Sequence, residues 1–264
     1  MPRLTVLGSG QDGGLPQLLS SHPNDVAARE WGVPSRLASS ALVEVGSTRL
    51  LLDASPDIRH QLADPVDAVV LTHGHMGHYA GLVHFGKEAA AMDALPLVAT
   101  PMMLSFLADN EPWAALFRGG HLEPVAVDPG GSTTVGDAEI GLLRVPHRAE
   151  FTDTVAISVG GMLYLPDIDA WEPWEGHHSV IGSHDLALLD ASFWSADEVP
   201  GRDVAEIPHP LVPDTIERFA DLSDRVVLTH LNHTNPLCDP NSPETAAVRD
   251  RGFRVAREGD RFEV

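Results

Sequence analysis

The 264-residue sequence predicts a layered α/β fold. Short runs of aliphatic and β-branched residues recur along the chain, and several are apolar throughout, as strands covered on both faces are. Segments with helical character lie between them, which favours stacked sheets and helices. With 43% apolar residues, the chain can bury a sizeable core. We find no internal repeat, low-complexity tract or linker, and therefore expect a single domain over residues 1–264.

The element boundaries follow from these runs. Strands are expected at residues 3–8, 40–45, 48–53, 67–72, 138–145, 153–159, 161–167, 185–191 and 225–230. Helices are expected at 83–94, 100–110, 212–222 and 242–252. The last helix has clear end signals, because Ser242 suits the N-cap, Pro243 the first turn and Gly252 the end.

The charge balance restricts the expected partners. The chain has 38 acidic and 17 basic side chains, a formal net charge of −21. Nucleic acids and anionic membranes attract clustered Lys and Arg, so neither is an expected partner. No apolar run approaches the roughly 18 residues of a membrane span, and the first residues lack the pattern of a secretory signal. The single cysteine, Cys238, excludes an internal disulfide framework and fits a reducing cytoplasm.

Histidine is the unusual residue, with 14 in the chain. The stretch LTHGHMGHYAG (71–81) places His73, His75 and His78 directly after an apolar run. His73 and His75 share one face of an extended chain, because residues two apart do so, and His78 can turn back from the following turn or helix. Imidazoles that converge at the end of a strand suit Zn²⁺ or another borderline divalent cation.

Other potential ligands also stand at the ends of expected strands. These are Asp53, His147, Asp167 and His230. In layered α/β proteins, functional groups gather where strands end and loops begin. The sequence therefore predicts a metal centre at one edge of the sheets.

The chain resembles the metallo-β-lactamase superfamily in the order and approximate spacing of Asp53, His73-x-His75-x-x-His78, His147, Asp167 and His230. It looks most like the PqqB (pyrroloquinoline quinone biosynthesis protein B) branch in GSGQDGGLPQ (8–17), RLASSALVEV (36–45), DASPDIRHQL (53–62), LLDASFWSADE (188–198) and THLNHTNPLCDPNSPE (229–244). This resemblance spans nearly the whole chain. It implies an αββα sandwich with a metal centre at one edge of its two sheets.

Carried over residue by residue, the resemblance also implies the ligand sets. One cation would be held by His73, His75 and His147, and a second by His78 and His230, with Asp167 bridging the pair. Asp53 would accept the remaining N–H of an imidazole. One or two divalent cations are therefore the expected cofactors, zinc first, with iron or manganese compatible with the same donors.

One departure from the superfamily pattern lies at position 77, where glycine replaces the usual aspartate of H-x-H-x-D-H. The second cation would keep three protein ligands, enough for a catalytic ion with open positions, at lower affinity. Asp169 is a candidate substitute carboxylate, and a Gly77→Asp change is expected to raise second-site occupancy. PqqB proteins usually lack the first two histidines of this turn, so the substrate of this chain need not be theirs.

The ligand set favours hydrolysis. A water bound to such cations loses a proton near neutral pH and attacks a carbonyl, so we expect a small ester, thioester or lactone as substrate. The PqqB resemblance implies an alternative, iron-dependent oxygenation or hydroxylation, because histidine and carboxylate ligands with open positions also suit iron. A non-catalytic metal-binding carrier is a third hypothesis.

Further side chains are expected near the metal centre. Asp190 ends another strand and is a candidate base, and His233, just past His230, is a candidate proton donor or substrate ligand. Four aromatic residues are candidates for the substrate wall: Trp171, Trp174, Phe193 and Trp194.

The segment GSGQDG (8–13) matches the dinucleotide fingerprint GxGxxG. A helix should open at its third glycine, but Pro16 and polar residues follow instead. We therefore exclude NAD binding and expect a turn or a glycine loop near the metal edge.

If the predicted ligands are correct, His73→Ala or His147→Ala will lose metal and activity together, because an open site with one imidazole fewer binds its cation poorly. Elemental analysis and turnover, measured on the same preparation, check this. Full metal content with full turnover in either variant would refute the ligand assignment.

Overall fold

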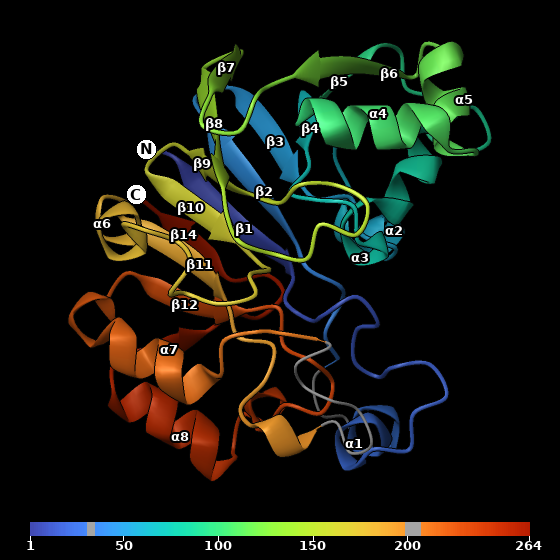
Figure 1. Cartoon of the computed structure of the whole chain (residues 1–264). Coiled ribbons are helices and arrows are strands. Elements are labelled where there is room, and N and C mark those ends of the chain that lie inside the picture. The colour runs from blue at the N-terminus through green and yellow to red at the C-terminus, as the bar shows by residue number, and fades with distance from the viewer. Residues whose placement is uncertain (31–34, 199–206) are drawn as a thin grey trace.

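The apolar runs form two β-sheets packed face to face in the computed structural model (Figure 1), which describes residues 1–30, 35–198 and 207–264. In spatial order, the first sheet contains β14 (Arg261–Glu263), β1 (Arg3–Gly8), β2 (Ser40–Val45), β3 (Thr48–Leu52), β4 (Ala68–Val70), β5 (Leu95–Ala99) and β6 (Leu122–Ala126). The second contains β13 (Arg254–Val255), β12 (Val226–Thr229), β11 (Leu186–Asp190), β10 (Met162–Leu165), β9 (Val155–Val159), β8 (Ala138–Arg144) and β7 (Ser132–Val135).

Helices cover the outer faces of the sheets. The α-helices are α1 (Pro23–Glu30), α2 (Ile58–Gln61), α3 (Met76–Tyr79), α4 (Pro101–Asp109), α5 (Trp113–Arg118), α6 (His177–Gly182), α7 (Val212–Arg218) and α8 (Pro243–Asp250). The 3₁₀ turns are η1 (Ala80–Phe85), η2 (Ala196–Glu198), η4 (Ala220–Leu222) and η5 (Pro236–Cys238). In Figure 1, α4 and α5 lie beside the first sheet, and α7 and α8 lie beyond the second. None of the helices in the described ranges has the length and apolar character to cross a membrane.

Three apolar clusters hold these layers together. The central cluster fills the space between the sheets and includes Leu50, Ile157 and Val227, all fully buried. A second cluster joins the β10–β12 region to α6, α7 and α8, and a third joins β3–β5 to α4 and α5. Each fully buried aliphatic side chain contributes roughly 1.5–3 kcal/mol to folding. The layers are helix, sheet, sheet and helix, which confirms the predicted αββα sandwich.

All of the expected strands form, with ends that differ by two residues at most. Three expected helices form as α4, α7 and α8, and the Ser242 side chain caps α8 by accepting from Thr245 N. The expected helix at 83–94 is wrong: η1 ends at Phe85, and turns follow in which Ala91 and Ala94 take left-handed backbone angles. Residues 87–91 are exposed, so a helix there would bury no apolar face.

Parallel pairing decides where the strand ends lie. Strands β3 to β6 run parallel in the first sheet, and β10 to β13 run parallel in the second. Their carboxyl ends therefore meet at common edges, and the segments that follow β3, β4, β10, β11 and β12 carry the predicted site residues.

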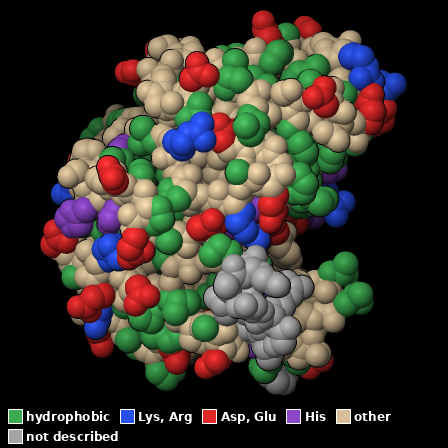
Figure 2. All heavy atoms as spheres, viewed as in Figure 1, with side chains coloured by type: hydrophobic (Ala, Val, Ile, Leu, Met, Phe, Trp, Pro, Cys, Tyr) green, Lys and Arg blue, Asp and Glu red, His purple; other side chains and the backbone are tan. Residues whose placement is uncertain are grey.

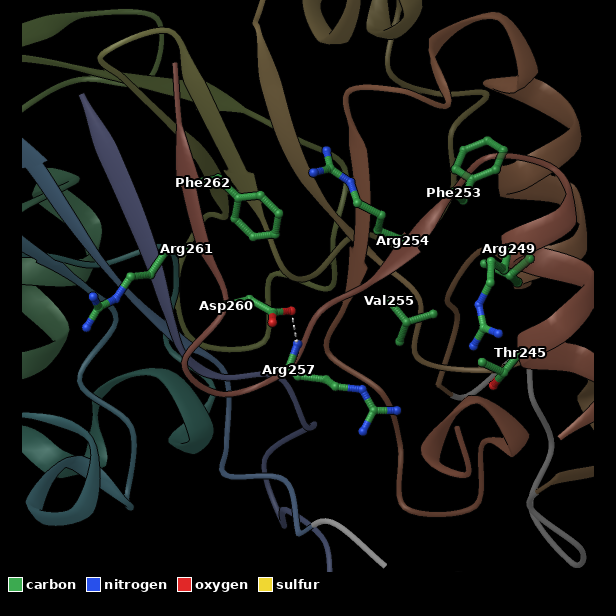
Figure 3. A pocket seen from close by; sticks show the side chains of 10 residues that line it. Thr245, Arg249, Phe253, Arg254, Val255, Arg257, Asp260, Arg261 and Phe262 are labelled. Carbon is green, nitrogen blue, oxygen red and sulfur yellow. Dashed lines mark hydrogen bonds between the residues drawn. The ribbon is translucent and has the colours of Figure 1, made fainter. Parts of the chain in front are cut away.

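A pocket of about 380 Å³ lies among α8, β13 and β14 (Figure 3), and none of its lining residues is a predicted site residue. Four arginines border it: Arg249, Arg254, Arg257 and Arg261. Figure 3 shows them pointing in different directions, and the Arg254 guanidinium lies over the Phe262 ring at 4.8 Å. These cations do not converge on one ligand position.

Candidate metal centre

Donor atoms from three loops converge in the first cluster, which comprises His73, His75, His147 and Asp167. His147 Nε2 lies 3.2 Å from His75 Nδ1 and 3.3 Å from Asp167 Oδ2. His73 Nε2 lies 3.4 Å from the same carboxylate oxygen. Ligands placed tetrahedrally around zinc, at about 2.0–2.1 Å from it, are roughly 3.3–3.4 Å apart. The spacing of these atoms therefore fits one tetrahedral cation.

The second cluster lies next to the first. It brings together Asp12, His78 and His230, and Asp12 Oδ1 lies 3.6 Å from His78 Nε2 and 4.0 Å from His230 Nε2. Asp167 also belongs to a further group with Asp190, His209 and His230, whose donor atoms lie within 4.8 Å of one another. Asp167 of the first cluster therefore lies close to His230 of the second, as a bridging ligand would.

Unpaired buried atoms support a cation at each cluster. Within the described residues, His73 Nε2, His78 Nε2, His230 Nε2 and Asp167 Oδ1 are buried without a hydrogen-bond partner. Leaving such an atom unpaired costs about 1–3 kcal/mol. A divalent cation in each cluster would satisfy these atoms, so the residues present fit a metal centre.

Each imidazole of the two clusters has an oxygen atom close to its outer nitrogen. His73 Nδ1 is 3.0 Å from Thr72 Oγ1, His75 Nε2 is 3.3 Å from Glu150, and His78 Nδ1 is 2.7 Å from Asp53. His147 Nδ1 lies 2.7 Å from Asp169, and His230 Nδ1 lies 3.0 Å from Ser192 Oγ. The contacts of His73, His78 and His230 are hydrogen bonds that hold the N–H on the outer nitrogen and leave the inner nitrogen as a ligand. Those of His75 and His147 are ion-pair distances to a carboxylate without hydrogen-bond geometry.

Burial also favours the ligand form of most of these rings. It lowers the pKa of His147 and His230 and, together with the charge of His78, brings the pKa of His73 well below its usual value. His78 differs: burial lowers its pKa too, but the Asp53 carboxylate outweighs burial and raises it to about 9. Asp53 therefore orients His78, which is the role expected of it.

Strained backbone supports two of these residues. Asp53 has φ 58° and His230 has φ 62°, the left-handed region that non-glycine residues avoid. Backbone hydrogen bonds from Asp53 N to Val70 O and from Leu231 N to Ser9 O, each 2.9 Å, hold the two segments. Both turns re-aim a side chain at the centre immediately after a strand ends.

A cleft of about 420 Å³ opens beside the second cluster. Its lining residues are Gln11, Asp12, Gly13, Gln17, Arg148, Phe193, Glu198, Ile207, His209, Asn232, His233 and Thr234. Asp12 and His209 are shared between this lining and the ligand groups, so the cleft gives access to the centre.

His209 is the main site residue that sequence reasoning missed. It is buried, its Nδ1 donates to Asp190 Oδ2 at 2.7 Å, and its Nε2 lies 3.4 Å from the Gln11 amide at the cleft wall. Burial lowers its pKa, but the carboxylates of Asp190 and Asp167 raise it to about 9. His209 ends no strand, so the strand-end pattern gives no signal for it.

Asp190 and His233 occupy the expected region but differ in exposure. Asp190 is fully buried and accepts from Ile168 N, Ser192 and His209, so it orients neighbours and cannot reach a substrate as a base. His233 lines the cleft and donates to Asp25 Oδ2 at 2.6 Å.

Only one of the four expected aromatic residues reaches this cleft. Phe193 lines it, with its ring 5.5 Å from that of His209. Trp171 and Trp174 are buried in the cluster under α7, where Trp171 Nε1 donates to Thr215 Oγ1, and Trp194 packs at the edge of the same cluster. The expected tryptophan wall is not found in this cleft, but Trp171 borders a separate cavity of about 600 Å³ that Asp169 and His209 also line.

Comparison with known proteins supports the metallo-β-lactamase fold and the resemblance to PqqB. A family model described as "Beta-lactamase superfamily domain" matches residues 48–231. Coenzyme PQQ synthesis protein B of Ruegeria pomeroyi is 31% identical over 97% of this chain and 98% of its own length. The crystal structure of Zn²⁺-bound PqqB from Methylobacterium extorquens is 25% identical, with a TM-score of 0.86 over 99% of this chain and 100% of that one. A diphosphatase of the PhnP family shares the fold at 22% identity, with a TM-score of 0.76 over 100% of this chain and 97% of that one.

The outer contacts generate a paired prediction. Asp169→Asn will weaken metal binding at the first cluster and Asp53→Asn at the second, each by about 10–100-fold, because each change removes the carboxylate that orients one imidazole. Stepwise zinc titration against a chromophoric chelator measures both sites. Thermal unfolding of the metal-free variants is the control for folding. If both changes weakened the same site, or neither changed affinity, the two-cluster assignment would be wrong.

Proposed function

Because the chain belongs to the metallo-β-lactamase superfamily and to its PqqB-like branch, we propose that it is a metallohydrolase that cleaves a small ester, thioester or lactone. The observation that carries this proposal is the pair of adjacent clusters at the cleft, the first containing Asp167 and the second containing His230, whose donor atoms also fall within one group. Divalent cations bound there would polarise a carbonyl oxygen and lower the pKa of a bound water.

Each protein group has a distinct task in this proposal. His73, His75 and His147 would hold one cation, His78 and His230 the other, and Asp167 both. Hydrogen bonds from Asp53 and Ser192 fix the directions of two of these imidazoles, and the Asp169 carboxylate lies 2.7 Å from the outer nitrogen of His147. The arrangement is set before a substrate arrives, which is the condition for stabilising developing charge without reorganisation.

The cleft supports a small substrate. Its volume of about 420 Å³ suits a metabolite-sized molecule. Phe193 offers an apolar surface, and Gln11, Asn232 and Arg148 offer polar groups that can position a carbonyl or a carboxylate. Asp and Glu side chains are scattered over the face seen in Figure 2, and the net charge is −21, which disfavours a long polyanion.

His209 is placed to bind the reacting group. Asp190 holds its Nδ1, so its Nε2 lies beside Gln11 at the cleft wall. We assign to this nitrogen a hydrogen bond to the leaving oxygen or sulfur of the substrate. His233 lines the same cleft and is held by Asp25. It would contact the substrate farther from the cations.

A second candidate function is iron-dependent oxidation. It is favoured by the relatives whose names place them in coenzyme PQQ synthesis and by the histidine and carboxylate donors, which also suit iron. A cytoplasmic location, where the buried thiol of Cys238 would stay reduced, is part of both proposals.

The hydrolase proposal is tested on protein purified without chelators or added metal. We expect about two equivalents of zinc, no visible colour, and turnover of a member of an ester, thioester and lactone panel that a chelator abolishes and zinc restores. Bound iron with a charge-transfer band and substrate-dependent O₂ uptake would contradict hydrolysis and support the oxidative candidate. A zinc-loaded protein inactive on the whole panel would contradict the ester-type substrate class.

His209 provides a second test, because it should separate catalysis from metal binding. His209→Ala is expected to lower kcat by about 100-fold or more while zinc content is unchanged, since the change removes a group that acts on the substrate. His60→Ala, at an exposed histidine of α2, is the matched control. A parallel loss of zinc in His209→Ala would show that His209 acts as a ligand.

A further inference from the structure

We propose that Asp12 supplies the carboxylate of the second metal site, in place of the aspartate that the superfamily pattern has at position 77. This inference rests on the proposed two-cation centre and specifies its ligands. It assigns a task to the GSGQDGG loop, which the sequence alone leaves as a turn.

The main observation is that Asp12 occupies the space of the missing side chain. A Cβ atom built on Gly77 would lie 2.0 Å from Asp12 Oδ1 and 2.5 Å from Asp12 Cγ. No side chain can enter at 77 unless Asp12 leaves. Glycine at 77 and aspartate at 12 are therefore sterically coupled: a carboxylate fills the space beside position 77, but it comes from another segment of the chain.

The position of the Asp12 carboxylate also fits a ligand. Its Oδ1 lies 3.6 Å from His78 Nε2 and 4.0 Å from His230 Nε2, and both nitrogens are buried without a hydrogen-bond partner among the described residues. These distances exceed the roughly 3.3–3.4 Å expected between two ligands of one tetrahedral zinc by a few tenths of an ångström. The Asp12 side chain is 48% exposed, so it is free to move that much closer to the two imidazoles. Its negative charge restores the anionic ligand that glycine at 77 removes.

Backbone contacts hold the loop against the second cluster. Gln11 N donates to Leu231 O at 2.9 Å, so the residue before Asp12 is bonded to the residue after His230. Gly14 N donates to Gln11 O at 2.7 Å, and Gly14 has φ +60°, which closes the turn that carries Asp12. The ligand from the loop and the ligand from β12 are therefore positioned together.

The other candidate carboxylate is excluded by its contacts. Asp169 lies 2.7 Å from His147 Nδ1, on the outer side of a first-cluster ligand. The inference also replaces the expectation that Gly77→Asp alone would raise second-site occupancy. That substitution would place two carboxylates in one space, with Asp12 Oδ1 displaced from its position.

The test is a double-mutant cycle on second-site zinc affinity, measured by chelator competition. Asp12→Gly and Asp12→Asn are expected to weaken the second site by about tenfold or more, since a lost ligand should cost at least as much as a lost outer contact. The first site should keep its affinity. Gly77→Ala should weaken the second site as well, although it removes no donor atom, because its Cβ expels the Asp12 carboxylate.

The most discriminating measurement of the cycle is whether Gly77→Asp raises or lowers the zinc affinity of the second site. This substitution should not raise second-site affinity in the wild-type background, but it should raise affinity in the Asp12→Gly background, where the space is open. That recovery will be partial, because the new Cβ would still lie 2.8 Å from Asp12 Cα and the loop must shift. Asp93→Asn, at an exposed acid outside the ligand groups, is the matched charge control, and thermal unfolding of the apo-proteins checks folding.

The outcomes separate this inference from the function on which it rests. A second zinc bound as tightly in Asp12→Gly as in the wild type would overturn the role of Asp12 and leave the two-cation centre intact. A gain from Gly77→Asp in the wild-type background would do the same. A wild-type protein that binds only one zinc would overturn the two-cation centre itself, and the inference with it.

Discussion

The centre depends on one buried carboxylate, Asp167, at the edge where the two sheets meet. Only 3% of its surface is exposed, and burial alone would raise its pKa. The nearby His209, His147 and His73 instead hold the pKa of Asp167 well below its usual range, so the carboxylate stays charged. A buried anion is costly unless positive charge compensates it. His209, whose pKa is raised to about 9, supplies part of that charge, and cations bound by the two ligand clusters would supply the rest.

The fold brings the site residues close together and also sets the directions of their side chains. Parallel strands bring the carboxyl ends of β3, β4, β10 and β12 to one edge, and the left-handed turns at Asp53 and His230 aim side chains inward there. Such backbone strain costs of order 1–3 kcal/mol per residue and persists only where surrounding contacts impose it. Strand pairing and the hydrogen bonds to Val70 and Ser9 impose it here.

The sequence predicted the parts of the site that follow a local pattern. Apolar runs followed by His or Asp located every residue of the first candidate cluster and two of the second, because strand ends are encoded by neighbouring residues. Asp12 and His209 were not predicted, since their roles depend on which loops meet in space. Trp171 was assigned to the substrate wall because a loop position in sequence does not tell whether an indole faces the cleft or the core.

The most direct test of this account is a crystal structure of the zinc-loaded protein with anomalous data collected at the zinc edge. We expect two peaks, one bound by His73, His75 and His147 and the other by Asp12, His78 and His230, with Asp167 contacting both. A single peak, or a second zinc that Asp12 does not contact, would contradict the account.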